Sequence, residues 1–327
     1  MNFTKLSYML FMMMSTTLTL SSNNWLGMWM GMEMNLLSFI PLIYKINDKN
    51  SAQGMMIYYL TQSIGSIIML FFILNYMMSI TPLIIKEYMK LPIIMGIMIK
   101  IGLPPFHNWM PEMMSMMSWM PCMMLMTWQK LAPMFTLSNM MMKSTTINII
   151  IMFTSMIGAL GGLNTTSLRK IMAFSSISHL SWMLMYMFMS IEWYKYMMIY
   201  SIINLMMCIT FMTTNSYFFN QLNNKMSMMG KYLMVVNLFS MGGLPPFLGF
   251  LPKWMVMQTM INNNMFFIMM WMIMMSLLTL FYYIQMISSL MMNYYYTNQW
   301  MMNMNNKSFT IMTWMNLKLP ILLTMSF

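Results

Sequence analysis

Long apolar runs cover almost the whole chain, and they restrict the fold more than any other feature. A helix that crosses the hydrocarbon core of a bilayer needs about 20 apolar residues. Eleven candidate spans follow one another, at residues 3–20, 24–44, 54–78, 91–119, 121–142, 145–163, 168–190, 194–217, 231–261, 265–290 and 308–326. We expect the first to be a retained helix and not a signal peptide, because no small-residue cleavage site follows it. The sequence predicts an all-α, polytopic membrane protein with about 11 transmembrane helices.

Charged residues are too scarce for a soluble fold. The 16 Lys and Arg and 5 Asp and Glu make up 6% of the 327 residues, against about 25% in ordinary soluble domains. The net charge of +11 comes from scattered residues, so positive membrane loops explain it better than nucleic acid as a partner. Cys122 and Cys208 lie in apolar runs without metal-binding spacing, and we interpret both as buried hydrophobic residues. The composition excludes soluble enzymes, disordered chains and disulfide-bonded secreted proteins.

Methionine is unusually frequent, with 65 residues. Methionine-rich tracts can bind copper(I), but here Met stands wherever Ile or Leu would serve, without fixed spacing. A nonstandard genetic code that replaces Ile by Met explains this pattern better. Animal mitochondria read an Ile codon as Met, so the composition indicates an organelle-encoded gene.

The fourth and ninth runs, each about 30 residues long, contain the same interruption. Two copies of one five-residue motif begin 141 positions apart: Gly102-Leu103-Pro104-Pro105-Phe106 and Gly243-Leu244-Pro245-Pro246-Phe247. Paired prolines remove two backbone donors and clash with the preceding turn, so each motif predicts a helix break. Within a membrane, such a break is tolerated only where the freed carbonyls face protein or water.

The two broken helices are five crossings apart and therefore run in opposite directions. This predicts two inverted five-helix repeats, about residues 1–142 and 145–290, within a single membrane domain of residues 1–327 that ends in a helix at 308–326. Two ordinary proline kinks are the alternative.

Loop charges predict the orientation in the membrane. Eight positive residues fall on the side of the N-terminus: Lys5, Lys45, Lys49, Arg169, Lys170, Lys225, Lys231 and Lys307. Four fall on the other side: Lys86, Lys90, Lys143 and Lys195. The positive-inside rule then places the N-terminus inside and the C-terminus outside.

Four ionisable residues lie near the middle of apolar runs: Glu33, Lys100, Lys130 and Lys253. Each costs at least about 2.5–3.5 kcal/mol at mid-membrane, so each needs a partner, water or a function. Lys100 precedes the first break, where the partial negative charge of a helix end favours its ammonium, and Glu33 is its expected partner. Lys253 follows the second break and opens a half-helix, whose positive end favours the neutral amine.

Several lysines within the membrane, together with one carboxylate, can pass protons from one to the next, because a desolvated lysine releases its proton more readily. The alternatives are structural ion pairs and, for Lys253, a side chain that reaches the membrane interface. His107 directly follows the first break, where we expect water, and His179 lies among serines of the seventh run. Each histidine is either a proton relay or a hydrogen-bonded structural residue.

Redox motifs are missing from the sequence. It contains no cluster of Cys, no His pair at haem spacing, no dinucleotide-binding turn and no phosphate loop. We therefore expect no cofactor and no metal on this chain, and no electron transfer by it.

Six motifs occur in order from the second run to the ninth. They are Glu33 with Asn35–Leu42; Lys100 with Pro105-Phe106-His107; Trp128-Gln129-Lys130-Leu131-Ala132-Pro133; Gly161-Gly162-Leu163-Asn164; Leu168–Ser176; and Gly242–Phe247 through Pro252-Lys253-Trp254. Together they resemble the antiporter-like membrane-arm subunits of NADH–ubiquinone oxidoreductase, respiratory complex I, in its animal and especially insect mitochondrial form. The first run, the loop around residue 220 and the last two runs match little, and Ser181 stands where related chains often have Gly.

The resemblance implies a proton-translocating subunit built from two inverted five-helix units, each with one broken helix. Glu33 and Lys100 would form the coupled charge pair, Lys130 the central relay and Lys253 the exit-side lysine. The implied location is the mitochondrial inner membrane, with the N-terminus in the matrix and the C-terminus in the intermembrane space.

The same resemblance implies a set of partners. NADH, FMN, iron–sulfur clusters and ubiquinone would lie on other subunits. The chain would be part of an obligate hetero-oligomer with other membrane-arm subunits, in contact with lipids, cardiolipin among them, and without nucleic acid. Two alternatives are a stand-alone cation/proton antiporter and a structural spacer that does not pump.

Overall fold

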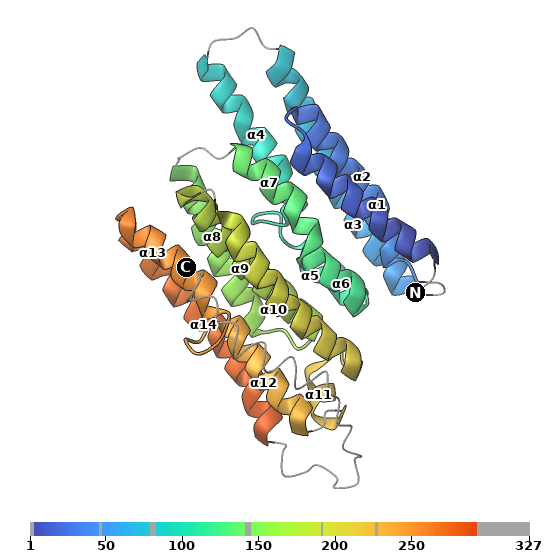
Figure 1. Cartoon of the computed structure of the whole chain (residues 1–327), viewed down its shortest axis with the longest axis vertical. Helices are drawn as coiled ribbons and strands as arrows, with labels where there is room; N and C mark the ends of the chain where they lie inside the picture. Colours follow the sequence, from blue (N-terminus) through green and yellow to red (C-terminus); the bar gives the residue numbers. More distant parts are fainter. Residues whose placement is uncertain are drawn as a thin grey trace. The chain divides into compact units, whose positions relative to one another are not determined.

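The computed structural model describes residues 3–45, 48–78, 83–140, 145–190, 192–225 and 228–292. These residues form fourteen α-helices and one short 3-10 helix. An isolated β-bridge joins Ser167 and Phe218. The chain divides into two compact units, residues 1–143 and 144–327, and within each unit long helices run side by side (Figure 1).

The first unit contains the helices up to α7. Their bounds are α1 Phe3–Ser21, α2 Trp25–Ile43, α3 Lys49–Met78, α4 Leu83–Ile101, α5 Trp109–Met116, α6 Trp119–Met126, η1 Trp128–Lys130 and α7 Leu131–Met140. Helix α1 packs along α2, and α3 packs against α2, α4 and α5. Helix α7 contacts α4 and α1, so the helices before and after the first break belong to one bundle.

The second unit contains the remaining helices. Their bounds are α8 Thr145–Leu163, α9 Leu168–Met189, α10 Trp193–Thr214, α11 Phe219–Lys225, α12 Met228–Gly242, α13 Phe250–Asn262 and α14 Phe266–Met292. Helix α9 lies at the centre of this unit. In its most hydrophobic stretch 89% of the residues are buried, and the helix contacts α8, α10, α13 and α14. Gly158 and Gly161 of α8 allow this close packing, because a Cβ atom at either position would clash with α9.

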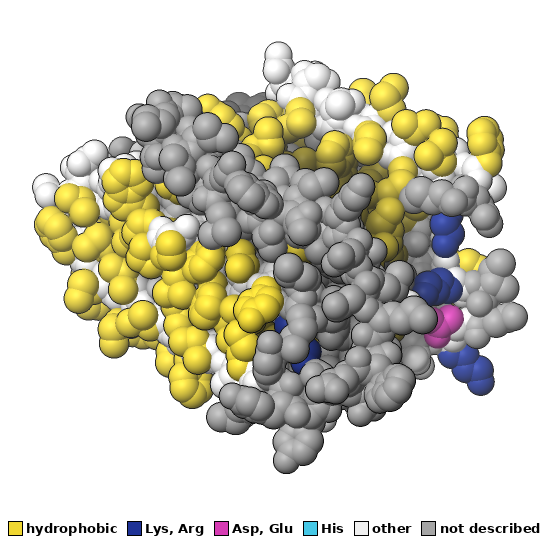
Figure 2. Space-filling model, turned by 60° about the horizontal axis from the view of Figure 1, so that its bottom comes forward, with side chains coloured by type: hydrophobic (Ala, Val, Ile, Leu, Met, Phe, Trp, Pro, Cys, Tyr) yellow, Lys and Arg dark blue, Asp and Glu magenta, His cyan; other side chains and the backbone are white. Residues whose placement is uncertain are grey.

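The described residues confirm the predicted all-α class. Within the described part of the chain, six helices are long and apolar enough to cross a membrane by themselves: Trp25–Ile43, Lys49–Met78, Thr146–Leu163, Leu168–Met189, Trp193–Thr214 and Phe266–Met291. Large hydrophobic side chains such as Phe11, Ile67 and Phe267 are exposed, as expected of a surface that faces lipid. Figure 2 shows many hydrophobic side chains on one face.

Several predicted spans consist of shorter helices. The fourth is divided into α4 and α5, and the ninth into α12 and α13, as the two motifs predict. The fifth is also interrupted, between α6 and α7, which we did not predict. The C-terminal helix predicted at 308–326 lies outside the described residues. The total of eleven spans and the inverted repeat therefore remain predictions.

The two predicted breaks begin with the same backbone turn. Gly102 and Gly243 have φ angles of 81° and 78°, a left-handed conformation that residues with a side chain rarely adopt. The following leucines, Leu103 and Leu244, donate to the carbonyl oxygens of Met98 and Phe239, five residues earlier. This is the hydrogen-bond pattern of a glycine-terminated helix. Both glycines therefore end their helices, two residues before the paired prolines from which the break is predicted.

Gly249 provides a test of how tightly the second break is packed. A Cβ atom added there would overlap the backbone carbonyl of Ser240, which no side-chain rotation can relieve. We expect Gly249→Ala to cost about 3 kcal/mol, the upper end of the usual range for overpacking, and to reduce the folded protein extracted from membranes severalfold. The control is Gly242→Ala, whose added atom would come no closer than 3.6 Å to Leu280. Equal recovery of the two variants would contradict the prediction.

Candidate functional site

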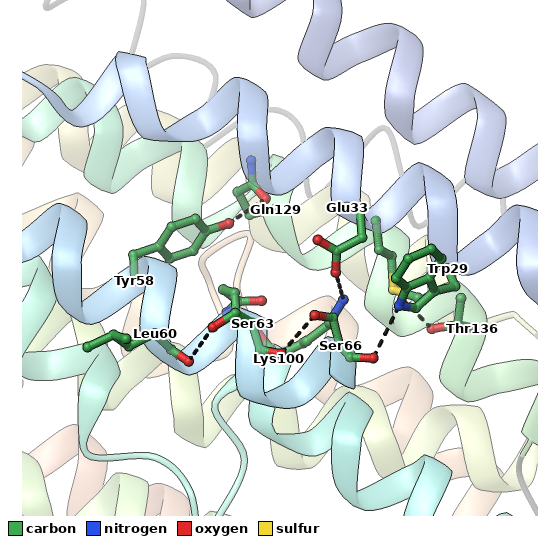
Figure 3. Close-up of polar contacts among 11 residues, drawn as sticks. Trp29, Glu33, Tyr58, Leu60, Ser63, Ser66, Lys100, Gln129 and Thr136 are labelled. Carbon is green, nitrogen blue, oxygen red and sulfur yellow. Dashed lines mark hydrogen bonds and ion pairs between the residues drawn. The ribbon is translucent and has the colours of Figure 1, made fainter. Parts of the chain in front are cut away.

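An ion pair in the first unit joins α2 to the end of α4. The ammonium of Lys100 lies 3.6 Å from Oε1 of Glu33, and Figure 3 shows the two side chains pointing toward each other. The Lys100 side chain is 2% exposed and that of Glu33 is 25% exposed. The distance exceeds that of a hydrogen bond, so the pair is electrostatic and loosely held.

The carbonyl groups freed by the first break have protein partners. The Gln62 side chain of α3 donates to the carbonyl oxygen of Lys100 at 3.1 Å. The indole of Trp109, at the start of α5, donates to the carbonyl of Ile99 at 3.1 Å. The last turn of a helix carries a partial negative charge. Lys100 lies in that turn, so this end of α4 stabilises its ammonium together with Glu33.

A polar cluster beside the ion pair connects α2 and α3 to η1. The Gln129 amide accepts from the Tyr58 hydroxyl at 3.3 Å (Figure 3). The same amide donates to Asn35 at 3.0 Å. Tyr58, Asn35 and Gln129, together with Gln62, line a cavity of about 30 Å³. A water molecule needs about 10–15 Å³ and two to four polar partners, so this cavity can hold water.

Lys130 lines the same cavity as Lys100. Helix α6 ends at Met126, and a single 3-10 turn, Trp128–Lys130, precedes α7. This change in helix type turns Lys130 inward, where it is 3% exposed. The structure therefore brings three of the four predicted residues together, because Glu33 contacts Lys100 and Lys100 shares a water-sized space with Lys130.

Lys253 occupies the second break. Its ammonium donates to the carbonyl oxygen of Gly242, the last residue of α12, at 2.8 Å, and the residue is 6% exposed. The chain position is as predicted, in the first turn of α13. However, the amine lies at the negative end of α12 and not at the positive end of α13. The reason given for a neutral Lys253 therefore does not hold, and the contrast in proton affinity with Lys100 stays a prediction.

The two histidines lie in different surroundings. His179 is buried in α9, where Nδ1 lies 2.9 Å from the Tyr196 hydroxyl, and it lines a cavity of about 10 Å³ together with Lys253. His107 is half-buried in the loop after the first break, with Nδ1 3.3 Å from the carbonyl of Pro105. His107 does not line the cavity that Lys100 and Lys130 share, so only His179 lies beside a predicted relay lysine.

One predicted loop charge is buried. Lys231 lies within α12 and is 3% exposed, so its place among the loop charges is wrong. Lys143 and Lys307, from the same count, lie outside the described residues. Glu192, in contrast, lies before α10 as a loop residue and forms a 2.7 Å ion pair with Lys195. The hydrogen bond from Lys195 lowers the pKa of the Glu192 carboxyl.

Sequence reasoning missed the neutral polar residues of the site: Asn35, Tyr58, Gln62 and Gln129. The signal for them is weaker than that for the lysines, because amide side chains occur in most of the apolar runs. A buried amide needs hydrogen-bond partners for both its oxygen and its nitrogen, and here these residues supply partners for one another and for the end of α4.

Comparisons with known proteins identify the family. Residues 22–279 match the family described as NADH:quinone oxidoreductase/Mrp antiporter, transmembrane. The NADH-ubiquinone oxidoreductase chain 2 of Locusta migratoria is 45% identical over 80% of this chain and 78% of its own length. That of Anopheles gambiae is 43% identical over 77% and 76%.

The fold is also similar to that of a solved structure. A chain of respiratory complex I from Thermus thermophilus superposes with a TM-score of 0.77 over 88% of this chain and 71% of that chain, at 16% identity. At this identity the likeness concerns the fold alone. The sequence matches carry the assignment, and they confirm the resemblance drawn from the motifs. The chain belongs to the NADH-ubiquinone oxidoreductase chain 2 family, within the NADH:quinone oxidoreductase/Mrp antiporter membrane proteins.

Proposed function

We propose that this chain is a proton-translocating membrane subunit of an NADH:ubiquinone oxidoreductase, and that Glu33, Lys100, Lys130 and Lys253 carry the protons within it. One observation carries the residue assignment: Lys100 and Lys130 are both buried and line one cavity that can hold water. Two lysines that share a water-sized cavity can exchange a proton through the water. Two lysines that only stabilise the fold would not require such a cavity.

The first step takes place at Glu33. A quarter of its side chain is exposed, so a neighbouring subunit can reach it and weaken its attraction for Lys100. The Lys100 ammonium then gives a proton to water in the cavity, and the amine of Lys130 accepts a proton from that water. The polar groups of Gln62, Gln129 and Tyr58 hold the water in place. Transfer onward to Lys253 completes the path, and the two units act as inverted repeats.

The remaining parts of the proposal follow from the family. The location is the mitochondrial inner membrane, with the N-terminus in the matrix and the C-terminus in the intermembrane space. The partners are other membrane-arm subunits and lipids, cardiolipin among them. NADH, FMN, iron–sulfur clusters and ubiquinone lie on other subunits, so the driving force reaches this chain through subunit contacts.

A triple variant tests the function. We expect Glu33→Gln, Lys100→Met and Lys130→Met together to remove this chain's share of the protons pumped per NADH, because no titratable path is left in the first unit. The measurement is proton release by the assembled complex in vesicles. A wild-type proton yield would favour a structural spacer. Exchange of sodium or potassium for protons by the purified chain alone would favour a stand-alone antiporter.

A further inference from the structure

His179, in α9 of the second unit, lies against two tyrosine side chains of α10. Its Nδ1 is 2.9 Å from the hydroxyl oxygen of Tyr196, and its ring centroid is 5.1 Å from that of Tyr200. All three residues are buried. The imidazole is therefore held in one orientation by its neighbours on α10.

The bond between Tyr196 and His179 determines which ring nitrogen carries the proton. A tyrosine hydroxyl keeps its proton at neutral pH, and within the described part of the chain Nδ1 of His179 is the acceptor that this hydroxyl reaches. If Nδ1 were the donor instead, the hydroxyl proton of the fully buried Tyr196 would be left without an acceptor, which is unfavourable. The hydroxyl therefore donates to Nδ1, and the neutral imidazole carries its proton on Nε2.

The small cavity that His179 shares with Lys253 is lined largely by hydrogen-bond acceptors. Its volume is about 10 Å³, roughly the space of one water molecule. A hydroxyl group has a single proton, and each hydroxyl that the described residues contribute to the cavity donates its proton to the carbonyl oxygen three residues earlier in its own helix. These hydroxyls belong to Ser155, Ser178, Ser181, Ser276 and Thr279. Toward the cavity, these groups can therefore only accept hydrogen bonds.

Acceptors alone stabilise only the charged form of Lys253. Its ammonium donates to the carbonyl oxygen of Gly242 at 2.8 Å, and hydrogen bonds to the charged form favour that form. Once the proton has left, the amine nitrogen has a lone pair that needs a donor. The Nε2–H group of His179 is such a donor, and Trp182, which also lines the cavity, has an indole N–H. A donor on this wall stabilises the form of Lys253 that receives the next proton.

We propose that Tyr196 is a positioning residue that keeps the proton of His179 on Nε2, so that this N–H group stabilises the deprotonated amine of Lys253 across the cavity. The inference rests on the proposed function, in which Lys253 carries protons. It also decides between the two roles predicted for His179. With the Tyr196 proton at Nδ1 and its own proton on Nε2, the ring has no nitrogen lone pair left to accept a proton. His179 is then a fixed donor and not a relay.

Two substitutions of His179 separate a fixed donor from a relay. Glutamine keeps an N–H donor at about the reach of Nε2 but does not titrate, whereas leucine has no donor. We expect His179→Gln to keep the wild-type number of protons pumped per NADH. His179→Leu should lower this chain's share by about two- to tenfold, the factor that corresponds to one lost hydrogen bond. Equal losses in the two variants would indicate a relay, and no loss in His179→Leu would show that its donor is not needed; either result overturns the proposal.

Tyr196→Phe tests the positioning role, because it keeps the ring and removes the hydroxyl. We expect the same loss of about two- to tenfold while His179 is present, and no further loss in a His179→Gln complex, because an amide side chain has no tautomers to select. Equal losses in both backgrounds would make Tyr196 merely structural and overturn the proposal, as would no loss at all. Tyr232→Phe is the matched control, because Tyr232 is exposed on α12, and it should keep the wild-type yield.

Lys253→Met distinguishes a failure of this inference from a failure of the proposed function. All yields are measured in vesicles and expressed per assembled complex, so that a loss of assembly does not appear as a loss of pumping. If Lys253→Met lowers the yield while Tyr196→Phe pumps normally, the inference is wrong and the proposed function stands. If Lys253→Met itself pumps normally, the proposed function fails at this lysine and the inference fails with it.

Discussion

Replacing Lys130 by Met is expected to leave the complex assembled while proton transfer through this chain falls by roughly 10²-fold or more, the usual contribution of a positioned proton-transfer group. Lys130 is buried in η1 and shares a cavity with Lys100, so its loss leaves no amine to accept the proton. Methionine has a similar length and no charge, so packing around η1 is preserved. The measurement is protons released per NADH oxidised by the complex in sealed vesicles.

Lys130→Arg separates proton transfer from electrostatics. Arginine keeps the positive charge but does not release its proton, so a relay fails in both variants, whereas a purely electrostatic role is rescued by arginine. Lys195→Met provides the matched control, since Lys195 pairs with Glu192 outside the site. A normal proton yield in Lys130→Met, or its recovery in Lys130→Arg, would remove Lys130 from the path.

Local sequence signals predict the breaks well. Gly102 and Gly243 end their helices in the same left-handed turn, because glycine and paired prolines determine backbone geometry within a few residues. The burial of Lys100 and Lys130 also follows from their position in apolar runs. These features depend only on residues that are close neighbours in the sequence, so a single sequence is enough to predict them.

Contacts between helices are much less predictable. The bonds from Gln129 to Asn35 and from Gln62 to the Lys100 carbonyl join residues 94 and 38 positions apart. They depend on how each helix is rotated about its axis. In a soluble protein the apolar face indicates this rotation, but a membrane helix is apolar all round. For the same reason, the reach of Lys253 back to Gly242 could not be foreseen.

Neutralising Glu33 and Lys100, singly and together, should separate their structural role from their functional one. Glu33→Gln leaves the Lys100 ammonium buried without its carboxylate, and removal of one partner from a buried pair costs about 3–5 kcal/mol. Because the Glu33 side chain is 25% exposed, the cost at this site should be at the lower end of that range. We expect less assembled complex in Glu33→Gln, and a smaller loss in Lys100→Met, since water or a neighbour can reach the remaining carboxylate.

The double variant, Glu33→Gln with Lys100→Met, removes both charges of the pair, so neither is left without its partner. Its assembly should therefore recover relative to that of Glu33→Gln. The recovery measures the coupling between the two residues, which is about 0.5–3 kcal/mol for residues in contact. Its proton yield should nevertheless stay as low as that of Lys100→Met, because the titratable amine is absent. Assembled complex is measured on native gels and the proton yield in vesicles. If both recover together, the pair only stabilises the fold; if assembly recovers alone, Lys100 exchanges protons and Glu33 controls when it does so.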